Sequence, residues 1–152
     1  MVNKTALISM LTALLLLLST AAMAQEITSC SSPKGKSFFH NGRDWIDDKL
    51  TAGVFTFKRG AAGYDLLYVD NRRRITSSTD DGAQVLLVRR GPKDATFLVA
   101  YPQNTIALYT IWEDRDGTAW MDLLQSKGGF NPRHRSSLLV GPCQPINWSV
   151  FE

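Results

Sequence analysis

The stretch "ATFLVAYPQNTIALYTIWEDRDGTAWMDLLQS", residues 95–126, contains three short apolar runs separated by two reversals. The runs cover 95–101, 105–113 and 118–126, and the reversals are "PQN" and "DRDG". Pro, Asn, Asp and Gly suit tight turns. The runs are rich in β-branched and aromatic residues and are too short for typical helices. This part of the chain therefore predicts three consecutive antiparallel strands.

The same rhythm of runs and turns extends in both directions from this stretch. Further strands are predicted over 54–59, 64–70, 73–78, 83–90 and 136–143. About eight strands with short connections predict an antiparallel meander. Because an open sheet leaves two unpaired edges, we expect an all-β fold that closes, or nearly closes, into a small barrel. A two-sheet sandwich is the alternative.

The first 52 residues read differently from the rest. Lys4, the apolar run 6–18 and the small residues around Met23 have the order and lengths of a secretory signal peptide. Cleavage is expected between Ala24 and Gln25, which leaves one β domain over 25–152 with no transmembrane helix. Residues 25–52, which include the loop-like "SSPKGK", are expected to form a mostly irregular N-terminal segment.

Two cysteines, Cys30 and Cys143, lie near the two ends of the mature chain. Cleavage after Ala24 leaves this even number in an oxidising compartment, which favours a disulfide. In the alternative, "ITSC" is a lipoprotein-type box and the chain is lipid-anchored at Cys30. A carboxylate between the apolar run and that box, Glu26, makes this second reading less favourable. We therefore expect a disulfide-bonded protein exported to the periplasm or the extracellular space.

Both faces of the central strands are apolar. In 105–113, Ile106 and Leu108 lie on one face, whereas Tyr109 and Ile111 lie on the other. A half-exposed sheet shows cleaner alternation of apolar and polar residues. We therefore expect the second face to be covered, by the chain's own ends rather than by a partner, because large exposed apolar patches are uncommon on monomers.

Composition and motifs exclude several classes of protein. The formal net charge is +3, and it falls to 16 − 14 = +2 once Lys4 is removed with the leader, which argues against a nucleic-acid-binding protein. No nucleophile elbow, phosphate loop or dinucleotide fingerprint is present. The two histidines, His40 and His134, do not have the spacing of a metal site. We expect no enzyme activity, no metal and no cofactor.

Two sets of residues are predicted to contact a partner or ligand. If the basic turns gather on one rim, they form an anion-attracting surface. Aromatic residues of the central strands are the expected interior ligand contacts. The rim set is Arg72, Arg73, Arg74, Arg89, Arg90, Arg133 and Arg135, and the interior set is Tyr101, Tyr109, Trp112 and Trp120.

These observations predict a non-catalytic binding module for a protein or an anionic component of the cell envelope. A lipocalin-like carrier of a small apolar ligand is the alternative, because the doubly apolar strands and their aromatics suit an open barrel interior. A hydrolase of envelope polymers ranks last, because no catalytic motif is present; it stays an alternative because catalytic residues can be assembled by geometry without a motif.

Overall fold

The computed structural model describes residues 24–39, 42, 44–69, 72–102, 104–128 and 134–152. The predicted signal peptide, apart from Ala24, lies outside these residues, as do His40 and Arg133. The described chain forms eleven strands and a 3-10 helix, and none of its helices is long and apolar enough to cross a membrane. The elements are β1 (Gln25–Ser31), β2 (Lys34–Phe39), β3 (Trp45–Lys49), β4 (Val54–Gly60), β5 (Gly63–Val69), β6 (Ile75–Ser77), β7 (Gln84–Arg90), β8 (Asp94–Tyr101), β9 (Thr105–Glu113), β10 (Ala119–Lys127), β11 (Arg135–Pro142) and η1 (Trp148–Phe151).

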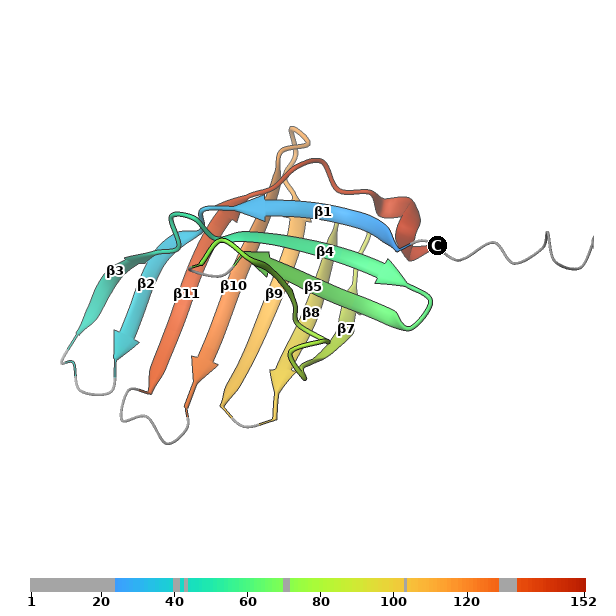
Figure 1. The fold of residues 1–152 in the computed structure, drawn as a ribbon. Coiled ribbons are helices and arrows are strands. Elements are labelled where there is room, and N and C mark those ends of the chain that lie inside the picture. Colours follow the sequence, from blue (N-terminus) through green and yellow to red (C-terminus); the bar gives the residue numbers. More distant parts are fainter. Residues whose placement is uncertain (1–23, 40–41, 43, 70–71, 103, 129–133) are drawn as a thin grey trace, which may run out of the picture.

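The strands form two antiparallel sheets that pack face to face (Figure 1). The small sheet has the order β1-β4-β5-β6, and the large sheet has the order β3-β2-β11-β10-β9-β8-β7. The large sheet has β3 at one edge and β7 at the other, and no described residues pair these two edges. The barrel prediction is therefore wrong, and the all-β sandwich is confirmed.

All eight strands predicted from the run-and-turn pattern are present as β4 to β11, and β7 to β11 form a meander. The prediction of an irregular segment over 25–52 is wrong, because β1, β2 and β3 lie within it. Within this segment, β2 and β3 are rich in Lys, Gly and Asp, which have low strand propensity. Pairing with distant partners stabilises them instead: β1 pairs with β4, and β2 pairs with β11.

The core lies between the small sheet and the part of the large sheet that it covers (Figure 1). Phe57 of β4 is fully buried, and its ring centroid lies 5.1 Å from that of Phe97 in β8 and 5.8 Å from that of Tyr109 in β9. Ile111 and Met121 of the large sheet are also fully buried. Odd-numbered positions of β8, β9 and β10 thus face the small sheet, as strand alternation requires.

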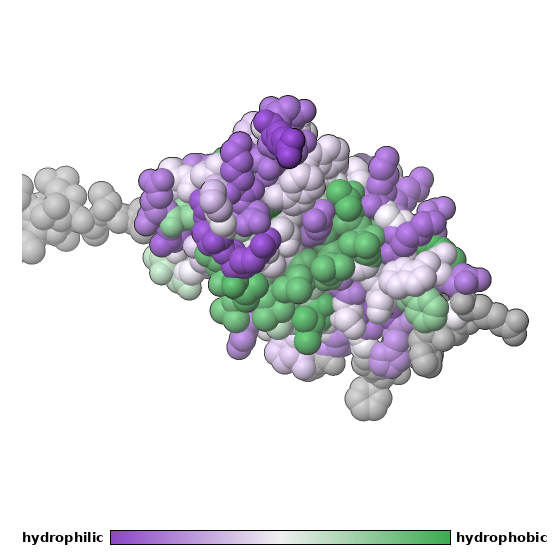
Figure 2. All heavy atoms as spheres, turned by 180° about the vertical axis from the view of Figure 1, so that it is seen from behind, coloured by the Kyte–Doolittle hydropathy of each residue, from purple (hydrophilic) through white to green (hydrophobic). Residues whose placement is uncertain are grey.

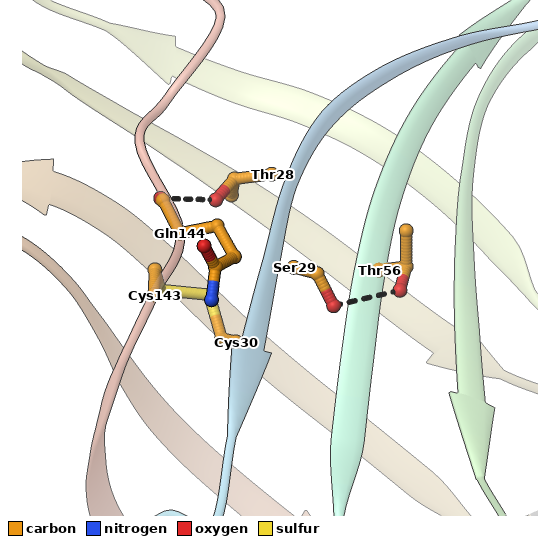
Figure 3. Close-up of a disulfide and its surroundings, with 6 residues drawn as sticks. All are labelled: Thr28, Ser29, Cys30, Thr56, Cys143 and Gln144. Atoms are coloured by element: carbon orange, nitrogen blue, oxygen red, sulfur yellow. Dashed lines mark hydrogen bonds between the residues drawn. A yellow bond between two sulfur atoms is a disulfide. The ribbon is translucent and has the colours of Figure 1, made fainter.

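The predicted disulfide between Cys30 and Cys143 is confirmed (Figure 3). It joins β1 of the small sheet to the residue that follows β11 of the large sheet. Beyond it, the chain runs along β1: the Gln144 amide donates to the Ser29 carbonyl at 2.8 Å, and the Thr28 hydroxyl donates to the Gln144 carbonyl at 2.7 Å. The C-terminal segment 143–152 therefore covers the free edge of the small sheet, where unpaired backbone groups would otherwise be exposed.

The helix η1 closes one end of the sandwich. Val150 is buried, and the Trp148 indole donates to Glu113 Oε1 at 2.8 Å. Arg90 lies 4.6 Å from the centroid of the Trp148 ring, within range of a cation–π contact. With this end closed by the C-terminus, the opening between the two sheets lies at the opposite end.

The outer face of the large sheet is not covered by the ends of the described chain, contrary to expectation. β1 and residues 143–152 lie on the small-sheet side (Figure 1). Apolar residues form a continuous band across the outer face (Figure 2), and Leu86, Ile106 and Leu124 are each about half exposed. The second apolar face that the sequence indicates is therefore present but open.

Candidate ligand-binding cleft

A wide cleft opens between the two sheets at the end opposite η1. The strands of the large sheet continue beyond the small sheet there (Figure 1), so that part of their inner face has no sheet packed on it. The cleft has a volume of about 1120 Å³ and is open to solvent. Its walls come from the ends of β8 to β11, from β5, and from the turns at 49–53 and 78–82.

Apolar side chains line much of the cleft. Tyr109 and Leu123 are buried on the inner face of β9 and β10, and Phe55 faces them from β4. The Phe55 ring centroid lies 5.7 Å from that of Tyr109. Leu50 and Phe39 extend this surface toward β2 and β3. The result is a half-enclosed apolar floor, as in many small-molecule sites.

A polar network lies beside this floor, on the inner face of β2, β3, β10 and β11. The Ser37 hydroxyl donates to Asp48 Oδ2 at 2.5 Å and lies 2.7 Å from the Ser137 hydroxyl. Arg135 Nη1 lies 3.7 Å from the same Asp48 oxygen, and Arg135 Nη2 donates to Gln125 Oε1 at 3.2 Å. The Arg135 guanidinium is thus held in place on the cleft wall, which both Arg135 and Gln125 line.

The guanidinium of Arg135 retains donor capacity. Its Nε is buried and has no hydrogen-bond partner among the described residues. The separation of 3.7 Å between Nη1 and Asp48 is longer than an ordinary hydrogen bond. Because an arginine offers five N–H donors, the Nη groups of this side chain can donate to a further anionic group without losing their present contacts.

Tyrosine hydroxyls lie on the opposite wall. Tyr68 donates to Asp81 Oδ2 at 3.0 Å, and Tyr101 donates to the Ser78 hydroxyl at 3.3 Å. Burial raises the pKa of Tyr68, and the hydrogen bond to Asp81 raises it further. Burial also raises the pKa of Tyr109 well above its ordinary value. The hydroxyls of Tyr68 and Tyr101 therefore act as hydrogen-bond donors on this wall.

The raised pKa of Tyr109 predicts a loss of stability in alkali. In the unfolded chain this phenol ionises near pH 10, whereas in the folded chain it resists ionisation. The contribution of this phenol to the free energy of unfolding is complete below about pH 10. It is lost as the pH rises further, by up to about 1.4 kcal/mol per pH unit. Urea unfolding at pH 8, 10 and 11 measures this decline, and Tyr109→Phe should make it shallower. An unchanged slope in that variant would show that Tyr109 is not the group responsible.

The structure brings together some of the predicted contact residues. Tyr101, Tyr109 and Arg135 all line the cleft. Trp112 and Trp120 do not: they pair with each other across β9 and β10, with ring centroids 6.4 Å apart, on the outer face of the large sheet. The prediction that these two tryptophans are interior contacts is therefore wrong. Their even-numbered positions place them opposite the residues that face the small sheet.

The basic residues do not gather on one rim. Arg72, Arg73 and Arg74 are exposed before β6. Arg89 and Arg90 end β7, and Arg90 pairs with Ala95 near the end of the sandwich that η1 closes. Arg135 pairs with Lys127 at the end where the cleft opens. Arg89 and Arg90 therefore lie at the opposite end of the strands from Arg135, and Arg133 is outside the described residues.

Other residues of the cleft were not predicted. Lys49, Lys127, Asp81 and Gln125 all line it. Lys49 and Asp48 belong to β3, in the segment expected to be irregular, so the sequence gives no register for them. Three cations and one carboxylate among the lining residues named here give the cleft a positive balance. Among the described residues, no three His, Cys, Asp or Glu side chains group as metal ligands.

Comparisons of the chain with models of protein families, with curated proteins and with solved structures found no match.

Proposed function

We propose that this protein is a non-catalytic binding module that holds a small amphipathic anion in the cleft between its two sheets. The observation that supports this most directly is the combination of an apolar floor with a guanidinium that Gln125 and Asp48 hold on the wall of the same open cavity. An anionic partner and an interior apolar ligand were separate expectations from the sequence. A molecule with an acidic head and an apolar body satisfies both.

The dimensions of the cleft suit such a ligand. Its volume of about 1120 Å³ is slightly above the range of about 300–1,000 Å³ that is typical of small-molecule sites. The apolar body would lie on Tyr109, Leu123 and Phe55, where burial of its surface provides the main favourable free energy. Specificity would come from the few polar groups around this floor.

The head group would lie at Arg135. A carboxylate there gains a charge-assisted hydrogen bond, which is roughly twice as strong as a neutral one. Lys127, which pairs with Arg135 across β10 and β11, adds a second positive charge at the same end of the cleft. These charges favour an anion over a neutral or cationic ligand of equal apolar size.

We also infer that the protein acts in an oxidising compartment after export. The disulfide supports this, because such bonds persist outside the reducing cytosol. It also supports cleavage after Ala24, because a Cys30 sulfur bonded to Cys143 cannot carry a lipid. The mass of the protein from its native host tests this inference: an N-terminus at Gln25 is expected, and a lipidated Cys30 would contradict it.

Calorimetric titration with three probes of equal chain length tests the function. Dodecanoate is expected to bind more tightly than dodecanol or dodecyltrimethylammonium. Replacement of Arg135 by glutamine should weaken dodecanoate binding by about 10- to 100-fold, because a hydrogen bond to a charged group contributes about 1.5–3 kcal/mol. Dodecanol binding should change much less, because its contacts are with the apolar floor.

The matched control is Lys36→Gln. Lys36 faces the other side of the large sheet, where it pairs with Asp47 at 2.8 Å, so this variant removes a charge of the same sign without touching the cleft. It should bind dodecanoate like the wild type. Equal affinity for the three probes, or equal losses in the two variants, would contradict the proposed function.

A further inference from the structure

The outer face of the large sheet carries an unbroken row of five leucines. The strand registers pair Leu86 with Leu98, Leu98 with Leu108, Leu108 with Leu124, and Leu124 with Leu138. Because directly paired residues point to the same face, these side chains form one line across five neighbouring strands. The leucine row consists of Leu86, Leu98, Leu108, Leu124 and Leu138.

This row lies on the surface of the described chain. Leu86, Leu124 and Leu138 are 48%, 50% and 46% exposed, and Leu108 is 36% exposed. Ile106 and Val140, on the rows to either side, extend the apolar band, which Figure 2 shows as a continuous green strip. Large contiguous apolar patches are uncommon on soluble proteins, and where they occur they mark interaction sites.

We propose that this face binds a second copy of the chain, sheet against sheet, in a two-fold symmetric dimer. The first argument is symmetry. Leu108 is the central member of the row, with two leucines on each side. A two-fold axis along β9 places Leu98 of one copy over Leu124 of the other, and Leu86 over Leu138. Every leucine then meets a leucine, as an interface between identical patches requires.

The second argument is area. Seven strands about 4.8 Å apart and about eight residues long give a face of about 30 Å by 27 Å, or on the order of 800 Å². A standard stable interface buries about 800 Å² on each partner. The outer face therefore has the size that a dimer of this kind needs.

The third argument is the distribution of charge. No member of the row from β7 to β11 is charged, whereas Lys36 and Asp47 continue the same row onto β2 and β3 as an ion pair. At the other edge, Arg89 pairs with Asp94 at 2.8 Å. An apolar centre with a polar rim is the anatomy of protein interfaces.

The same axis also predicts a charge contact between the copies. Asp122 pairs with Thr110, which pairs with Thr96, which pairs with Arg89, so these four share the row beside the leucines. The axis along β9 places Asp122 of one copy over Thr96 of the other, next to Arg89. Opposite charges therefore approach each other at the edge of the apolar centre.

This inference goes beyond the proposed ligand-binding function and is independent of it. The cleft lies on the inner face of the large sheet and the leucine row on the outer face, so the dimer leaves the cleft open. A failure of one proposal does not affect the other.

Sedimentation equilibrium of the purified, disulfide-bonded protein tests the dimer. The wild type is expected at twice the chain mass at micromolar concentration. Leu108→Glu and Leu108→Lys should each weaken self-association by more than about 100-fold, because each places two like charges opposite one another on the axis. An equimolar mixture of these two variants should form a heterodimer, because opposite charges then meet.

The matched control is Ile75→Lys, which adds the same charge at an apolar side chain that is 73% exposed on β6 of the small sheet. It should remain dimeric, and unchanged circular dichroism of all variants excludes unfolding. A monomeric wild type, or a mixture that stays monomeric, would overturn the proposal. A monomer that sediments with phosphatidylcholine vesicles would assign the face to a lipid surface instead and would also overturn it.

Discussion

Replacement of both cysteines by alanine is expected to lower the free energy of unfolding by about 4–5 kcal/mol. The two cysteines are 113 residues apart, so the bond closes most of the described chain into one loop. In the chain-entropy account, a cross-link that closes about 100 residues removes enough freedom from the unfolded chain to have this effect. This loss is a large fraction of the free energy of unfolding of about 5–15 kcal/mol that is typical of a domain.

The structure adds a second reason for this effect. Cys30 is fully buried, and the disulfide holds the C-terminal segment against the free edge of β1 (Figure 3). Without it, only noncovalent contacts hold that segment, among them the hydrogen bonds from the Gln144 and Asn147 amides to β1. We therefore expect residues 143–152 to show the largest increase in amide hydrogen exchange in the double variant.

Guanidinium unfolding measures the change in stability. Either single replacement should cost about as much as both together, because the loss of one sulfur already breaks the bond. Dithiothreitol should destabilise the wild type and leave the double variant unchanged. A double variant within about 1 kcal/mol of the wild type would show that the bond contributes little to stability.

Replacement of Phe57 by alanine is expected to cost about 3–5 kcal/mol, as removal of a fully buried phenylalanine does in other cores. Phe57 is the side chain of the small sheet that contacts both Phe97 and Tyr109 of the large sheet. The alanine leaves a cavity at this contact between layers, and the close-packed surroundings relax only partly into it.

Urea unfolding followed by tryptophan fluorescence measures this loss. Phe57→Leu, which keeps most of the apolar volume, should cost much less. Ile75→Ala, at a highly exposed site of the same sheet, should change stability by less than about 0.5 kcal/mol. If Phe57→Ala were as mild as Ile75→Ala, the two sheets would not be held together at this point.

The parts of the fold that depend on local pattern were predictable from the sequence. In β4 the alternation of Phe55 and Phe57 with Thr56 and Lys58 identifies both the strand and its buried face. Turn residues mark the limits of β7 to β11 to within about two residues. Local propensity and tertiary packing favour the same structure along these segments, and this agreement makes them predictable from the sequence.

The parts that depend on distant pairing were not predictable. β2 has the sequence "KGKSFF", which has little strand character, and it is ordered because β11 offers an edge about 100 residues further along the chain. Even spacing of strands along the sequence is compatible with a barrel and with a sandwich. Which strands belong to the small sheet is decided by the pairing of β1 with β4, from a separate stretch of the chain, and spacing does not reveal that pairing. Asp48 was missed for the same reason, although Arg135 beside it was named.

The order in which the strands pair has a consequence for synthesis. β2 is made early, yet the Ser137 hydroxyl that Ser37 contacts lies 100 positions later, and β1 gains its C-terminal cover only from the last ten residues. Contacts between such distant positions form late and slow a chain's folding. A nascent chain therefore cannot complete the sandwich until β11 and residues 143–152 have been made.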